Sequence, residues 1–134
     1  MAENPNCTDA PIDAFAQLTS TSSTSTPTSV YTGPAASSTS TGGAKVGVFK
    51  AISTDTTQAI ALAVYKTISS MDYLVGFVSI PQASGATLPA IVDILDELWG
   101  DIMNLGAGTT IKVMPAVAPA SGKIVNIQLE GATF

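Results

Sequence analysis

Apolar and polar residues alternate most clearly near the end of the chain. Val125, Ile127 and Leu129 are separated from one another by single polar residues. A period of two is typical of a β-strand with one face buried and the other face exposed. The run 124–131 therefore predicts a strand whose three apolar side chains point into a core.

Similar short apolar runs, split by turn residues, fill the rest of the chain from Lys45 onward. They predict further strands at 45–54, 59–67, 73–80 and 109–117. Several short strands with a turn roughly every ten residues favour an antiparallel β-sandwich or barrel. We therefore expect an all-β fold of mostly antiparallel strands, with at most one or two short helices.

A serine- and threonine-rich stretch precedes these strands, and nine of the ten residues 19–28 are Ser or Thr. Threonine is common in strands, and short apolar segments flank the stretch. This favours two strands, at about 14–19 and 28–34, joined by a polar loop. Composition alone equally permits a flexible linker.

The segment 89–103 has a different period. Its apolar residues follow the i, i+3, i+4, i+7 spacing of one helix face, namely Ile91, Ile94, Leu95 and Leu98. Acidic residues occupy the opposite face, which favours an amphipathic helix of two or three turns. The β-branched start also allows 90–95 to be a strand with a helical turn only after it. A turn is expected next, at 104–108.

Residues 1–14 are polar, contain two prolines and offer little to a core. We expect them to form an extended N-terminal arm, followed by a single domain over 15–134. The first residues have neither a basic stretch nor an apolar run, so no signal peptide is expected. The apolar runs are also shorter than a membrane span. These features predict synthesis in the cytoplasm.

The chain carries few charged residues for its length. About 46% of its residues are hydrophobic and only 11% are charged, whereas soluble domains average about 25% charged residues. Either a secreted or oligomeric protein, or one whose surface lies largely against protein neighbours, would fit this composition. The net charge is −5 and there is no arginine, so we expect no binding to nucleic acid or to anionic membranes.

Residues that usually carry catalysis are scarce. There is no histidine, which removes the usual general base and the commonest metal ligand. Cys7 is the only cysteine, so it cannot form an internal disulfide. The acidic cluster Asp93, Asp96, Glu97 and Asp101 could attract a divalent cation, but it lacks the spacing of a calcium loop and fits a solvated helix face better. We expect no enzyme activity, no metal and no cofactor.

The aromatic residues Tyr31, Tyr65, Tyr73 and Trp99 are spread singly through the predicted elements. Such residues usually pack in a core or between subunits, although they can also stack on sugars. An exposed aromatic platform would indicate a glycan-binding protein, whereas buried aromatics would favour an assembly protein.

Several stretches resemble small virion proteins of tailed phages, of the capsid decoration (cement) or minor capsid kind. The stretches that carry the resemblance are FAQLT, SVYTGPAASS, GGAKVGVFKAISTDTTQA, ALAVY, SIPQASGATLPAIVDIL, LGAGTTIKV and the terminal GATF. They cover roughly residues 15–134. Gly47-Val48 and DILDELWGDIM depart from the group's pattern, so the docking surface can differ.

The resemblance implies a jelly-roll-like β-sandwich without catalysis, located on the capsid surface of a virion and in the host cytoplasm during assembly. The implied partners are the major capsid protein and further copies of the chain, with a trimer as one option. A tail or head–tail connector component is an alternative within virions, and a carbohydrate-binding or adhesin-like sandwich is an alternative of another class. The candidate interface residues are Pro5, Pro11, Ile12, Phe15 and Phe134.

Overall fold

The computed structural model describes residues 10–84 and 91–134. Within these ranges the chain forms nine strands and one short helix. The strands are β1 (Pro11–Leu18), β2 (Thr28–Thr32), β3 (Ala44–Ser53), β4 (Ile60–Ile68), β5 (Met71–Ile80), β6 (Val92–Asp93), β7 (Met103–Leu105), β8 (Thr110–Pro115) and β9 (Val125–Thr133). The helix, α1, is Ile94–Trp99. The predicted all-β class is confirmed.

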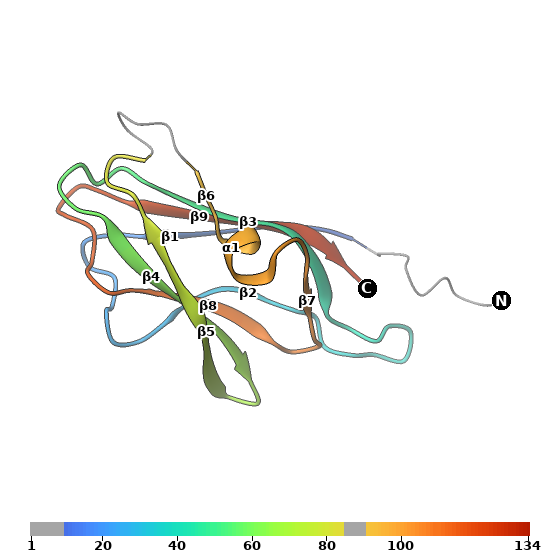
Figure 1. Cartoon of the computed structure of the whole chain (residues 1–134). Coiled ribbons are helices and arrows are strands. Elements are labelled where there is room, and N and C mark those ends of the chain that lie inside the picture. Colours follow the sequence, from blue (N-terminus) through green and yellow to red (C-terminus); the bar gives the residue numbers. More distant parts are fainter. Residues whose placement is uncertain (1–9, 85–90) are drawn as a thin grey trace.

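The strands form two antiparallel sheets that face each other (Figure 1). The first sheet has the order β1-β9-β3-β6, and β7 also pairs with β3, whereas the second has the order β2-β8-β4-β5. Because β6 and β7 pair with different parts of β3, the two can be counted as one interrupted strand. With that count, the strand order is that of a jelly roll, so the predicted jelly-roll-like sandwich is confirmed.

The core lies between the two sheets. Val125, Ile127 and Leu129 are fully buried in it, as predicted from their alternation. β9 runs between β1 and β3, so both of its edges are paired. Its polar residues point to the opposite face of the sheet, because successive side chains of a strand alternate between faces.

The predicted boundary between the arm and the domain is wrong. Strand β1 starts at Pro11 and pairs with β9 along its whole length, up to Leu18 opposite Val125. Ile12 is only 7% exposed and belongs to the core. A strand at the edge of a sandwich can form with only every second residue apolar, because the neighbouring strand supplies the partners for its backbone hydrogen bonds. Residues 10–14 therefore belong to the domain, and the rest of the predicted arm lies outside the described residues.

The segment after residue 90 combines both of the expected structures. Val92 and Asp93 form β6, and α1 follows with Ile94 and Leu95 buried. The helix has only six residues because Gly100, with φ of +86°, ends it. Ile91, which was expected on the apolar face of the helix, precedes the helix and is exposed. Residues 103–105 form β7, so the turn expected at 104–108 begins only after Leu105. The first part of the segment, 89 and 90, lies outside the described residues.

The polar loop between β1 and β2 is confirmed. Its hydroxyl groups hydrogen-bond to nearby backbone, as when Ser22 Oγ accepts from the N–H of Thr19 at 2.8 Å. Strands β4 and β5 form a long hairpin through the two residues Ser69 and Ser70, which have φ of 51° and 66°. Positive φ at both positions is the signature of a type I′ turn. In Figure 1 the end of this hairpin projects beyond the two sheets.

Candidate functional site

Within the described residues, the candidate interface residues do not form one surface, although the start of β1 pairs with the end of β9 and so places Pro11 opposite Ala132, close to Phe134. Ile12 lies in the core and is not available to a partner. Pro11 is exposed at the start of β1. Phe134 is partly buried, and its carbonyl accepts a hydrogen bond from Ser40 Oγ at 2.7 Å. Pro5 lies outside the described residues. Only Phe15 presents a large apolar side chain, with 64% of it exposed.

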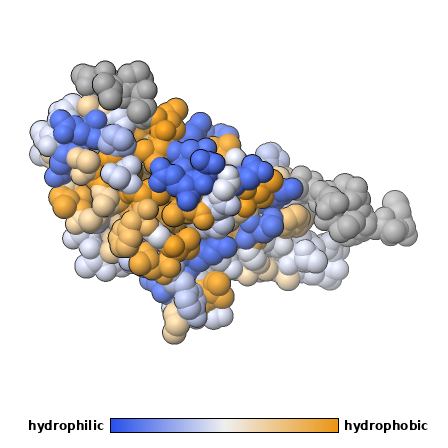
Figure 2. Space-filling view, viewed as in Figure 1, coloured by the Kyte–Doolittle hydropathy of each residue, from blue (hydrophilic) through white to orange (hydrophobic). Residues whose placement is uncertain are grey.

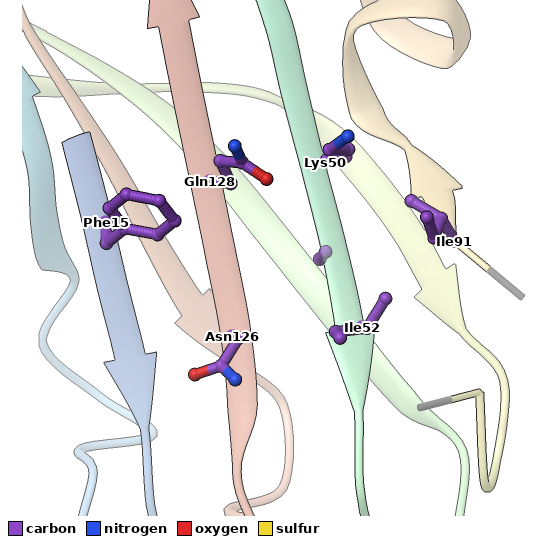
Figure 3. A pocket seen from close by; sticks show the side chains of 7 residues that line it. Phe15, Lys50, Ile52, Ile91, Asn126 and Gln128 are labelled. Atoms are coloured by element: carbon purple, nitrogen blue, oxygen red, sulfur yellow. The ribbon is translucent and has the colours of Figure 1, made fainter. Parts of the chain in front are cut away.

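Phe15 lines a groove on the outer face of the first sheet (Figure 3). The register explains this position: Phe15 of β1 is opposite Gln128 of β9, which is opposite Lys50 of β3. Residues paired in this way share one face of a sheet. A second row below it contains Asn126 and Ile52.

The groove has a volume of about 360 Å³ and is open to solvent. Its apolar ends are Phe15 on one side and Ile52 with Ile91 on the other (Figure 3). Ile91 is 61% exposed. The amides of Asn126 and Gln128 lie between these ends, and Lys50 is the one charged residue among the described residues of the lining. Such a surface can bind by apolar contact and amide hydrogen bonds.

Three of the acidic residues near α1, Asp93, Asp96 and Glu97, stabilise the helix. Asp93 caps the helix, because its Oδ1 accepts a hydrogen bond from the N–H of Asp96 at 3.0 Å. Asp96 and Glu97 lie in the first turn, where negative charge interacts favourably with the helix dipole. No group of three or more potential metal ligands occurs within residues 10–84 and 91–134.

Two of the aromatic residues pack against each other. The rings of Trp99 and Phe49 are 6.2 Å apart between centroids, and Phe49 is fully buried. Lys66 Nζ lies 5.9 Å from the centroid of the Trp99 ring, which is within the range of a cation–π contact. Burial lowers the pKa of Lys66. Trp99 is therefore largely engaged within the domain, whereas Tyr73 is about half exposed on β5.

A second exposed apolar surface, which sequence reasoning missed, lies on β5. We call it the β5 surface, and its residues are Met71, Tyr73, Leu74, Val75 and Phe77. Figure 2 shows hydrophobic residues gathered along this strand, to the lower left of the centre of the view. The sequence feature that could have indicated this surface is the continuous apolar run YLVGFVSI. A run without alternation is typical of a strand that is covered on both faces. In the sandwich, however, β5 is an edge strand of the second sheet.

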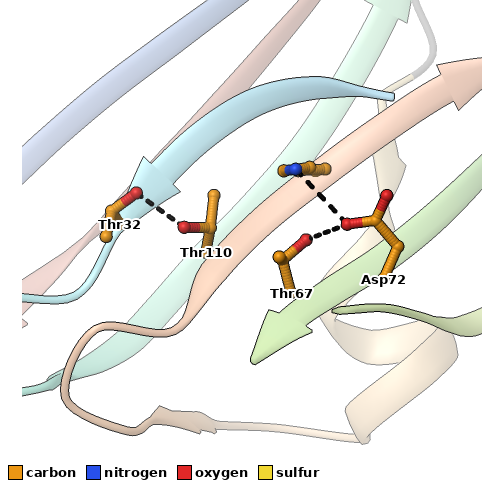
Figure 4. A network of polar contacts seen from close by, with 5 residues as sticks. Thr32, Thr67, Asp72 and Thr110 are labelled. Carbon is orange, nitrogen blue, oxygen red and sulfur yellow. Dashed lines mark hydrogen bonds and ion pairs between the residues drawn. The ribbon is translucent and has the colours of Figure 1, made fainter. Parts of the chain in front are cut away.

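A row of polar side chains crosses the second sheet beside the β5 surface (Figure 4). Thr32 and Thr110 share a hydrogen bond of 2.8 Å between β2 and β8. Farther along the row, the hydroxyl of Thr67 donates to Asp72, and Lys112 Nζ lies 3.3 Å from Asp72 Oδ1. The hydrogen bond from Thr67, helped by Lys112, lowers the pKa of Asp72. The one charge on β5 is therefore neutralised within the chain.

None of the helices within the described ranges has the length and apolar character needed to cross a membrane. No protein-family model matches the chain, and no curated protein is significantly similar to it in sequence. The two surfaces that can bind a partner are the groove at Phe15 and the β5 surface.

Proposed function

We propose that this chain is a non-enzymatic structural protein of a phage virion, which binds the major capsid lattice as a decoration (cement) or minor capsid protein. The observation that carries the proposal is the groove at Phe15. It exposes the large apolar side chains of Phe15 and Ile91 on the outer face of the first sheet, away from the core between the two sheets.

Two further features support this proposal. Large exposed apolar patches on a domain mark interaction sites. Only 11% of the residues of this chain are charged, and a surface with few charges associates readily with other proteins. A capsid presents the same surface many times, so a small module can be held by a weak contact that symmetry repeats. The jelly-roll order occurs in viral capsid domains, which adds an analogy of fold.

The proposal is tested with particles of the phage that encodes the chain, assembled without it. Purified chain should sediment together with these particles, and the particles should then resist heating better. Phe15→Glu places a charge at the edge of the groove and should weaken this binding at least about tenfold, a loss of about 1.4 kcal/mol. Val117→Glu is the matched control, because Val117 is also exposed but lies outside both surfaces.

Two results would refute the proposal. The first is that the purified chain fails to sediment with such particles. The second is that native virions, analysed by mass spectrometry, lack the chain. Binding that is equally strong for the Phe15 and Val117 variants would show that the groove is not the contact.

Glycan binding at the same groove is a second candidate function. It is favoured by the position of the exposed Phe15 ring beside the amides of Gln128 and Asn126, since sugars stack on aromatic faces and hydrogen-bond to amides. Jelly rolls also include lectin domains. A glycan array would show binding that Phe15→Ala removes if this function is correct, and no binding if the groove serves only protein contacts.

A further inference from the structure

We infer that two copies of this chain associate through β5, edge to edge and antiparallel, so that the second sheet continues from one copy into the other. The inference deepens the proposed function, on which it rests, by naming one partner and the strand that binds it. It concerns a different surface from the groove at Phe15.

The backbone of β5 provides the first argument. It is the last strand in the order β2-β8-β4-β5, so within the described residues only β4 pairs with it. An unpaired edge presents N–H and C=O groups that can pair with another strand. Natural proteins usually protect such edges with lysine, proline, a β-bulge or a very short strand. β5 has ten residues and contains neither lysine nor proline, and its one irregularity is the shift of register against β4 at Val75.

The side chains of β5 provide the second argument, because they are apolar on both faces of the strand. Leu74 is opposite Tyr65, and Tyr73 is opposite Lys66. Since neighbouring residues on a strand point to opposite faces, Leu74 and Tyr73 lie on different sides of the sheet. Phe77 is 61% exposed and Met71 is 58% exposed. A strand of this kind matches one that is covered on both faces, yet within the described residues Met71–Val75 is exposed throughout.

A second copy is the partner that best fits this edge. An antiparallel edge is complementary to itself, and a two-fold axis brings the same residues of both copies together. Charge does not oppose the contact, because Asp72 is the only charged residue of β5 and Lys112 neutralises it within each copy.

The available area is also sufficient. The five residues of the β5 surface and the adjacent Ile68 are each about half exposed, which amounts to roughly 600 Å² of side-chain surface per copy. If the contact covered all of this surface, two copies would bury roughly 1,200 Å², which is the lower end of the range for specific interfaces. We therefore expect a dimer that dissociates in the micromolar range.

The test is sedimentation equilibrium of the full chain at concentrations from about 1 to 100 μM. We expect a dimer whose dissociation constant rises at least tenfold, by rough estimate, in Phe77→Glu and in Leu74→Lys. The control Val117→Glu should leave the constant unchanged. Circular dichroism establishes that each variant is folded, and either variant that folds decides the result.

A covalent test needs no loss of binding. In a Cys7→Ser background, Val75→Cys should form a disulfide between two copies under mild oxidation, because Val75 lies near the middle of β5 and so near the two-fold axis. Val117→Cys in the same background should not. A chain that stays monomeric throughout, or a dimer that neither β5 variant weakens, overturns the inference. A cyclic trimer overturns it too, because it requires two different patches rather than one.

The particle-binding assay separates this inference from the proposed function. If a monomeric chain binds particles and Phe77→Glu abolishes that binding, β5 contacts a lattice protein; the inference is then wrong and the proposed function stands. If the chain dimerises through β5 but no particle binds it, the inference stands and the proposed function is wrong.

Discussion

Asp55 offers the sharpest test of how the two sheets are held in position at one end of the sandwich. It is fully buried in the loop after β3. Its Oδ1 accepts hydrogen bonds from the N–H of Thr57 at 2.9 Å and from the Thr57 hydroxyl at 2.7 Å. Its Oδ2 accepts from Gln58 Nε2 at 3.1 Å and from the N–H of Ala120 at 2.9 Å. One carboxylate thus joins the β3–β4 loop to the β8–β9 loop.

Replacing Asp55 by Asn should be strongly destabilising even though the two side chains have the same shape. The amide keeps one accepting oxygen, which can still serve Thr57. Its NH₂ group then faces two donors, Gln58 Nε2 and the N–H of Ala120, so two bonds to a charged group are lost. At about 1.5–3 kcal/mol for each such bond, we expect a loss of about 3–6 kcal/mol in the free energy of unfolding.

The acid dependence of stability should change in the same variant. The hydrogen bonds from Ala120 and Thr57 lower the pKa of Asp55 well below its ordinary value. A carboxyl whose pKa is lower in the folded state stabilises the fold above its unfolded pKa of about 3.9, and this contribution is lost as pH falls below that value. The difference in stability between wild type and Asp55→Asn should therefore shrink between about pH 7 and pH 3.

Urea denaturation at several pH values measures both effects. Asp13→Asn is the control, because Asp13 is exposed on β1, and it should change the free energy of unfolding by no more than about 0.5 kcal/mol. Equal losses of stability for the Asp55 and Asp13 variants would show that the buried carboxylate does not hold the two loops together. So would a difference between wild type and Asp55→Asn that stays constant as the pH falls.

Three further predictions concern the fold. Ile127→Ala should lower the free energy of unfolding by about 2–5 kcal/mol, whereas Gln128→Ala should have little effect; equal losses in urea denaturation would mean that the register of β9 is wrong. Replacing Ser69-Ser70 by Asn-Gly should raise stability by about 1 kcal/mol, because both positions have positive φ; a lower melting temperature would contradict this. A chain that starts at Ala14 should melt far below the full chain, because it lacks the buried Ile12; a shift of only a few degrees would restore the predicted arm boundary.

The sequence alone determined the class of fold and the inward residues of the later strands. Alternation in β9 placed Val125, Ile127 and Leu129 correctly, because a period of two is a property of the local backbone and needs no knowledge of the neighbouring strands. Turn residues between the apolar runs likewise predicted most of the turns. The local pattern failed at Ile12, where the apolar content of a short segment was too small to indicate a strand. Only pairing with β9 shows that this side chain reaches the core.

The sites were decided by tertiary structure. Phe15 was predicted to be an interface residue, but nothing in the sequence shows that Gln128 and Lys50 lie beside it, because their alignment depends on the register between strands far apart in the chain. The apolar run of β5 indicated a strand covered on both faces, and the topology places that strand at the end of a sheet. Local patterns fix which residues avoid water, whereas the order of strands decides whether the chain itself can cover them.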